Sequence, residues 1–302
     1  KHKEIHGLLS PGSTAAADTK VAFSAGMKDT GFILAGTNEL NLVFTRIITN
    51  VGQAYSEKTG FFTAPVKGVY FFRFTLADAL TTRWVYIRMV KNEEEVLKMG
   101  EYDTDGHRTY LTDGVTLQLE RGDKVNLRLP AGNRLQEEAT VQNTFSGFLL
   151  AATETEVVNL EKEITEKPKV AFSAGLTDSG FIEAGNNELN LVFTRIITNV
   201  GQAYSNTMGF FTAPVKGVYY FRFTLADALS TRWVYIRMVK NGEQVMKLGE
   251  YDTDGYRTFL SSGVTLQLEV GDEVNMRLPA GYRLYEESTA QNTFSGFLLF
   301  PL

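Results

Sequence analysis

The residues whose types and spacing best fit a metal ion lie in two short acidic loops. Asp103–Gly106 reads Asp-Thr-Asp-Gly, and Asp252–Gly255 repeats these four residues. Ca²⁺ takes about six to eight oxygen ligands, and two aspartates with a hydroxyl between them supply several of these. Neither loop has the glutamate that closes an EF-hand. Two interpretations stay open, an ordinary solvated turn and a Ca²⁺ site formed by Asp103, Asp105, Asp252 and Asp254.

A loop that differs between the two copies is the best candidate for contacting a ligand. The first copy contains Asn133, Arg134 and Gln136, and the second reads Tyr282, Arg283 and Tyr285. An exposed tyrosine offers a large contact area at small entropic cost. The second loop is therefore predicted to bind more strongly, and the alternative is drift between the copies without a change in specificity.

Side chains for catalysis are scarce. The chain has three histidines and no cysteine, which removes thiolate nucleophiles, disulfides and Cys-ligated zinc. His107 is replaced by Tyr256, and the second copy has no histidine on which to build a Ser-His-Asp arrangement. We expect a protein that is not an enzyme, and Ca²⁺ is the only cofactor for which the residues offer ligands.

The composition excludes two classes of partner. The net charge of −5 supplies no positive field for a phosphate backbone, so we expect no nucleic acid. No apolar run approaches the ~20 residues that span a bilayer, so we expect no membrane insertion. Aromatic residues make up 12% of the chain, which is ample material for packed cores.

The chain consists of two long repeats. They align without gaps and are roughly 80% identical, and a period this long indicates a duplicated domain rather than a solenoid. We expect an N-terminal arm at 1–19, domains at 20–151 and 169–302, and a linker at 152–168. Val157, Leu160 and Ile164 give the linker a short helical stripe, and the alternative is an acidic spacer.

Each copy has the pattern of a β-sandwich. Short runs of alternating apolar and polar residues, rich in aromatic and β-branched side chains, are bounded by Gly, Asp and Asn, which predicts many short strands. Asn241-Gly242 predicts a two-residue type I′ hairpin. Its counterpart Asn92-Glu93 should be the looser turn, because a glutamate with positive φ costs about 1 kcal/mol.

Eight residues in each copy resemble the signature of the complement C1q globular-head family. The endings Phe145–Leu149 and Phe294–Leu298 are similar to that family's final strand, and 62–70 is similar to short secreted C1q-like proteins of fishes. The signature residues are Phe44, Asn50, Tyr55, Phe62, Gly68, Tyr70, Phe72 and Phe74, and Phe193, Asn199, Tyr204, Phe211, Gly217, Tyr219, Phe221 and Phe223.

The resemblance implies an all-β chain of two tandem ten-stranded jelly rolls of the tumour-necrosis-factor type, assembled as a homotrimer. Family members bind calcium through an aspartate that follows a tyrosine, as Asp103 and Asp252 do. The family's second aspartate is replaced here by Leu111 and Leu260, unless Asp105 or Asp113 takes its role. In 70–74 both alternating sets of side chains are apolar except Arg73. One set should fill the sandwich and the other form the subunit contact; the alternative is that both lie in one core.

The resemblance also implies a secreted, multivalent, pattern-recognition or lectin-like protein whose ligand is a glycan or a microbial surface. Two alternatives remain, a self-assembling structural protein of the extracellular space and a cytokine-like ligand of a cell-surface receptor. There is no Gly-x-y collagen run, so recruitment of proteases through a collagen stalk is not expected.

Overall fold

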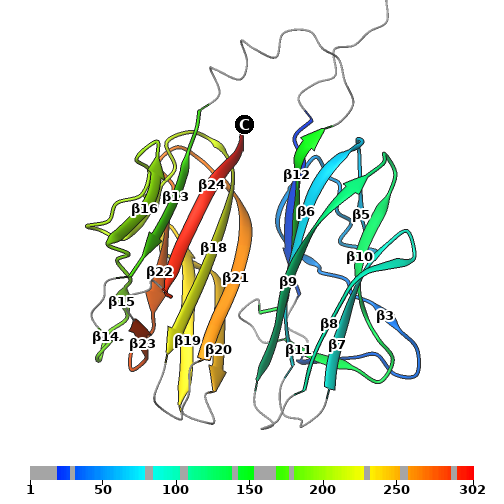
Figure 1. The fold of residues 1–302 in the computed structure, drawn as a ribbon, viewed down its shortest axis with the longest axis horizontal. Coiled ribbons are helices and arrows are strands. Elements are labelled where there is room, and N and C mark those ends of the chain that lie inside the picture. Colours follow the sequence, from blue (N-terminus) through cyan, green and yellow to red (C-terminus); the bar gives the residue numbers. More distant parts are fainter. Residues whose placement is uncertain are drawn as a thin grey trace, which may run out of the picture.

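Two β-sandwiches of the same topology lie side by side in the computed structural model (Figure 1). It describes residues 19–27, 31–78, 84–102, 108–137, 142–152, 168–176, 180–227, 232–251, 258–286 and 291–302. The expected N-terminal arm and the linker with its helical stripe lie almost entirely outside these residues. The described part holds no helix that could cross a membrane.

The first domain contains twelve strands, and every pairing between them is antiparallel. The strands are β1 (Ala22–Gly26), β2 (Gly31–Leu34), β3 (Leu40–Asn41), β4 (Arg46–Val51), β5 (Phe62–Thr63), β6 (Gly68–Asp78), β7 (Trp84–Lys91), β8 (Glu94–Tyr102), β9 (Thr109–Leu119), β10 (Lys124–Leu129), β11 (Arg134–Glu137) and β12 (Thr144–Ala152).

The second domain repeats them. Its strands are β13 (Ala171–Gly175), β14 (Gly180–Glu183), β15 (Leu189–Asn190), β16 (Arg195–Val200), β17 (Phe210–Thr212), β18 (Gly217–Asp227), β19 (Trp233–Lys240), β20 (Glu243–Tyr251), β21 (Thr258–Leu268), β22 (Glu273–Leu278), β23 (Arg283–Glu286) and β24 (Thr293–Pro301).

Ten strands of each domain form two facing five-stranded sheets, as predicted. One sheet has the order β4-β1-β12-β6-β9, and the other has β3-β10-β7-β8 with β5 also paired to β10. A ribbon of β2 and β11 adds a short third sheet. The second domain has the corresponding orders β16-β13-β24-β18-β21 and β15-β22-β19-β20. We name the sheet that contains β1 or β13 the inner sheet, since it lies toward the other domain (Figure 1).

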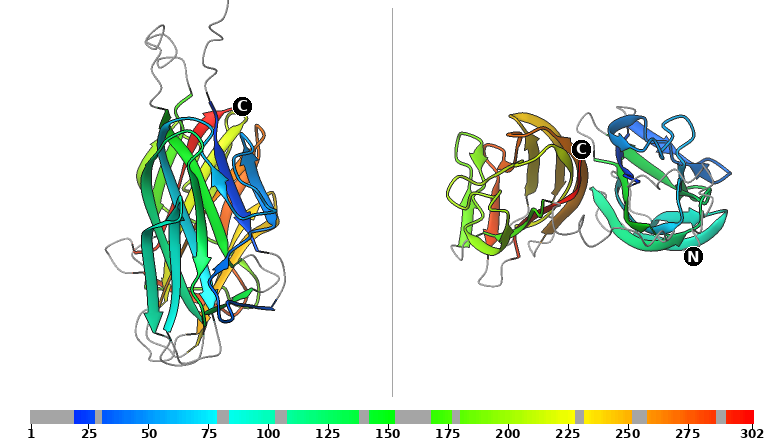
Figure 2. Two further views of the ribbon diagram at one scale, coloured as in Figure 1. Left: turned by 90° about the vertical axis from the view of Figure 1, so that its right-hand side faces the viewer. Right: turned by 90° about the horizontal axis from the view of Figure 1, so that it is seen from above.

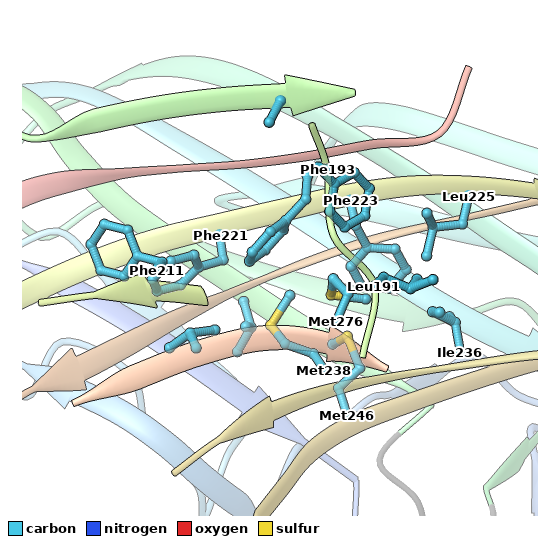
Figure 3. Packing of buried hydrophobic residues seen from close by; sticks show 14 of the residues in the cluster. Leu191, Phe193, Phe211, Phe221, Phe223, Leu225, Ile236, Met238, Met246 and Met276 are labelled. Atoms are coloured by element: carbon cyan, nitrogen blue, oxygen red, sulfur yellow. The ribbon is translucent and has the colours of Figure 1, made fainter. Parts of the chain in front are cut away.

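The signature aromatics form the cores. In the second domain Phe193, Phe211, Phe221 and Phe223 pack in one cluster with the methionines Met238, Met246 and Met276 of the outer sheet, which faces the inner sheet (Figure 3). The matching rings of the first domain are fully buried as well. Gly147 belongs to this packing, because a Cβ there would lie 2.6 Å from the Phe72 ring. Burial of so many aromatic rings is the main stabilising term of each domain.

The polar members of the signature fix one loop. The Tyr55 hydroxyl accepts a hydrogen bond from the Phe44 backbone N–H at 2.9 Å, and Asn50 Nδ2 donates to the Tyr55 carbonyl at 2.8 Å. Tyr204 and Asn199 make the same bonds in the second domain. Burial raises the pKa of both tyrosines to about 12. These residues therefore position the strand β4 or β16 that follows Phe44 or Phe193.

Both hairpins have the predicted turn. Asn241 and Gly242 have φ of 51° and 85°, and Asn92 and Glu93 have φ of 48° and 73°. Both central residues thus adopt positive φ, as a type I′ turn requires.

The alternating residues of β6 separate as predicted. Tyr70, Phe72 and Phe74 belong to the core of the first domain, while Phe71 belongs to a cluster that joins the two domains. The interpretation that both sets lie within one core is therefore wrong. The surface that Phe71 contacts belongs to the sister domain of the same chain.

Candidate functional site

Three of the predicted ligand-contacting residues lie near the end of the first domain away from the C-terminus. Asn133 accepts a hydrogen bond from the Tyr86 backbone N–H at 2.9 Å. Arg134 forms an ion pair with the buried Asp78 at 3.0 Å and stacks on Phe32. Gln136 is half-buried in β11 opposite Phe32. Asn133 and Arg134 therefore support the local fold with most of their polar groups.

The same loop is aromatic in the second domain. The Tyr282 ring meets Tyr235 edge-on at 4.9 Å, and Tyr235 stacks on Trp233 at 5.3 Å. Tyr285 lies 4.9 Å from Phe181, over which the Arg283 guanidinium is placed at 4.0 Å. Arg283 also pairs with the buried Asp227, as Arg134 does with Asp78. Tyr282, which stands where the first domain has Asn133, thus extends the row of rings formed by Trp233 and Tyr235.

We name Trp233, Tyr235 and Tyr282 the aromatic platform. All three rings are half-buried, and Lys247 holds its ammonium 4.1 Å from the centre of the Tyr235 ring. At the corresponding positions the first domain has Trp84 and Tyr86, stacked at 5.4 Å with Lys98 over Tyr86, and Asn133 in place of Tyr282. Sequence reasoning missed the tryptophan and Tyr235. The signal was present, because Trp-x-Tyr at period two places both rings on one face of a strand.

The predicted calcium residues cannot be placed. Asp103, Asp105, Asp252 and Asp254 all lie outside the described residues. Within the described ranges, no three Asp, Glu or His residues gather as a metal site would require. The calcium site therefore stays a prediction.

The two domains meet through a polar and aromatic contact. Phe148 of the first domain packs on Tyr220 of the second at 5.3 Å between ring centres, in a cluster with Ala22 and Val218. Arg73 is buried and donates to the Tyr220 hydroxyl and to Ser261 Oγ, both at 3.4 Å. The contact therefore contains both apolar burial and directional bonds.

Hydroxyl groups complete this contact. The side-chain oxygens of Thr75 and Ser262 lie 2.9 Å apart, and Thr49 donates to the Thr265 carbonyl at 2.8 Å. At one end, the Tyr110 hydroxyl and the Arg108 guanidinium both reach the Gly249 carbonyl. The inner sheet of the first domain thus receives the strand β21, at the edge of the second domain's inner sheet.

A cavity of about 640 Å³ opens beside this contact. Its apolar lining comes from Phe71, Phe148, Tyr220 and Phe297, and its charged lining from Arg73, Arg222 and Asp113. Both domains contribute to it.

Comparisons with known proteins agree with this architecture. The family model described as C1q domain matches residues 22–150 and 171–299. Complement C1q tumor necrosis factor-related protein 3 of Mus musculus is 33% identical over 132 residues, which is 44% of this chain and 52% of that protein. The matched stretch therefore spans about half of this relative.

Two solved structures match a part of the chain that is about one domain long. The globular domain of zebrafish complement 1qA matches with 20% identity and a TM-score of 0.36, over 44% of this chain and 99% of that one. Eiger TNF of S. frugiperda matches with 14% identity and a TM-score of 0.38, over 47% of this chain and 99% of that one.

Proposed function

The chain belongs to the C1q domain family, and on that premise we propose that it is a secreted, non-enzymatic recognition protein that binds surface glycans through several sites at once. Weak sites joined on one body gain avidity, because the first binding event raises the effective concentration of the others. The proposal includes association of the jelly rolls in threes, which multiplies these sites.

The observation that carries the proposal is the aromatic platform at the loop end of the second domain. Half-buried rings that keep part of their surface exposed suit the apolar C–H groups of a sugar, and they give contact area at low entropic cost. The platform lies beside β23, and Figure 1 places β11 and β23 at the same end of the molecule, opposite the C-terminus. The binding ends of both domains therefore project in one direction.

A glycan array tests the proposal. We expect the wild-type chain to bind a defined set of glycans, and Tyr282→Asn, which installs the residue of the first domain, to lower binding by about threefold to tenfold, since an aromatic contact contributes about 0.5–1.5 kcal/mol. Asn133→Tyr is the reciprocal variant and should raise binding. Absence of any glycan signal would contradict the proposal and favour a structural role.

Repeating the array with a chelator tests the calcium prediction separately. If Asp103, Asp105, Asp252 and Asp254 hold Ca²⁺ that orders a binding loop, then EDTA should reduce the array signal, and added Ca²⁺ should restore it. An array signal that EDTA leaves unchanged would show that glycan binding does not depend on Ca²⁺.

A further inference from the structure

Two arginines at equivalent positions of the repeat line the cavity between the domains. Arg73 lies on β6 and Arg222 on the matching strand β18. Figure 2 shows the two domains from above, side by side, with the inner sheet of the first domain toward the second. Arg222 alternates with the core residues Phe221 and Phe223, so its side chain points away from the core of its own domain. The cavity of about 640 Å³ therefore receives a positive charge from each domain.

No acidic residue pairs with either arginine in the part of the chain that the structure describes. Arg73 is only 6% exposed, and its bonds go to two neutral groups of the cavity wall, the Tyr220 hydroxyl and Ser261 Oγ, both at the long distance of 3.4 Å. Arg222 is exposed, and within the described ranges its guanidinium has neither an ion pair nor a hydrogen bond. A buried cation without a counter-ion is costly, so an anion that reached Arg73 would be stabilising.

Small residues on the neighbouring strands leave room beside each arginine. A glycine stands opposite each of them on one side and a serine on the other: Gly114 and Ser146 for Arg73, and Gly263 and Ser295 for Arg222. Directly opposite side chains are the ones that would cover a strand residue, and these are too short to cover a guanidinium. The repeat thus builds the same open arginine twice, and the contact between the domains brings the two copies to one cavity.

The remaining wall of the cavity is mostly aromatic. Phe148 and Phe297 meet edge-on at 6.3 Å between ring centres, and Tyr220 lies 5.6 Å from Phe297. Phe71 and Leu150 extend this apolar wall. Sites for small molecules are typically cavities of about 300–1,000 Å³ that are largely apolar and carry a few convergent polar groups. The cavity between the domains meets this description in size and in lining.

The charge of the lining favours an anion. Asp113 is the one acidic residue that lines the cavity in the described structure, against two arginines. Its Oδ1 accepts a hydrogen bond from the Gly114 backbone N–H at 2.7 Å, and neither arginine forms an ion pair with it in the described ranges. The wall therefore keeps one positive charge more than it balances.

We propose that this cavity binds a small amphipathic anion, a carboxylate at the end of an apolar chain. The carboxylate would bond to Arg73 and Arg222, because the planar guanidinium offers two parallel donors that match its two oxygens. The chain would lie against Phe148 and Phe297. The site goes beyond the proposed function, since it uses the contact between the domains in place of the aromatic platform and needs neither a glycan nor a second chain.

Calorimetric titration with decanoate tests the site. One decanoate should bind per chain. Acetate has the same head without the chain, and decanol has the same chain without the charge, so each should bind about tenfold more weakly or less tightly still. Decyltrimethylammonium carries the opposite charge and should not compete. Equal affinity for decanoate and decyltrimethylammonium would show adsorption to apolar surface alone and would overturn the proposal.

Two charge variants test the part of the arginines. Arg222→Met should lower the affinity for decanoate by about tenfold or more, since bonds between charged groups are the strong ones. Asp113→Asn should raise it, because the variant removes the acid of the cavity wall. Both residues are exposed, so folding should persist, which circular dichroism checks. Arg121→Met, at an exposed arginine outside the cavity, is the matched control, and an Arg222→Met chain of unchanged affinity would overturn the proposal.

An aromatic variant tests where the chain of the ligand lies. Phe297→Ala should lower the affinity for decanoate by about threefold to tenfold, because an aromatic wall is lost. Phe259→Ala, at a residue 48% exposed outside the cavity, is the control and should leave it unchanged. Equal losses in both variants would contradict binding in this cavity.

Light scattering on the same samples identifies a competing occupant. A wild-type chain that binds no decanoate would overturn the proposal, and a mass above that of a single chain would then assign the cavity to another polypeptide. Calorimetry reports the cavity, whereas the array reports glycan binding. Decanoate binding without a glycan signal would leave this site standing and reject the recognition role, and a glycan signal without decanoate binding would do the opposite.

Discussion

Asp123 and Asp272 close the same turn in the two domains, and each carboxylate is held by neighbouring donors. Burial opposes ionisation of Asp272, but hydrogen bonds from Asn241, Lys240 and the Glu269 backbone outweigh it and lower its pKa from 3.8 to about 2. The pKa of Asp123 is lowered by the equivalent groups. The turn residues thus stabilise the folded state through their charged form.

The stability from Asp272 should depend on pH in a defined window. The folded state binds the proton less tightly than the unfolded chain, so this contribution is complete above about pH 4 and is lost as the pH falls toward 2. Asp272→Asn should flatten the pH dependence of the free energy of unfolding between pH 4 and 2, measured by urea denaturation. Glu94→Gln, at an exposed carboxylate, is the control, and an unchanged slope in Asp272→Asn would contradict the assignment.

At the scale of elements, the two type I′ hairpins form a matched pair that differs by one residue. Glu93 holds a positive φ that glycine adopts without cost, and its ion pair with Arg128 is exposed on the glutamate side. Glu93→Gly should therefore stabilise the first domain by about 0.5–1 kcal/mol and raise its melting temperature by about 2–4 °C. Gly242→Glu should destabilise the second domain by a similar amount in calorimetry. Destabilisation of the first domain by Glu93→Gly, or stabilisation of the second domain by Gly242→Glu, would refute this explanation.

At the scale of the whole molecule, the sister contact holds the two sandwiches parallel. Thr265 is fully buried in it, so Thr265→Arg would bury an unpaired charge and should separate the domains. At high dilution the maximum dimension of the Thr265→Arg chain from small-angle X-ray scattering should therefore increase. Thr116→Arg should leave it unchanged, because Thr116, at the position of Thr265 in the first domain, is exposed. An unchanged dimension in Thr265→Arg would show that this contact does not hold the domains together.

The fold could be predicted from the sequence because the residues that specify it do so by their type and by their spacing from near neighbours in the chain. The signature aromatics such as Phe72 are spaced by strand period and loop length, and Asn241-Gly242 specifies its own turn. Residues such as Arg134 were harder to interpret. A charged side chain in a loop suggested a ligand, but its partner Asp78 lies 56 residues away and becomes visible only in three dimensions.

The contact between the domains could not be predicted at all at the level of residues. Arg46–Val51 and Arg195–Val200 are identical, so no property of the segment explains why Thr49 is buried against the sister domain while Thr198 is exposed. Only the position of the sister domain does so. The alternation in β6 did indicate a second packed surface, and its separation from the core was predicted correctly.

The parallel arrangement of the sandwiches has a consequence for what such a protein can sense. A protein that bound glycans at the loop ends of both domains, as proposed, would engage several sugars only where they are crowded on a common plane. A sparsely decorated membrane or a free oligosaccharide would occupy one loop end at a time, and that single engagement would be short-lived. Occupancy should then rise steeply above a threshold of sugar density, so the protein would distinguish a dense coat from scattered copies of the same sugar.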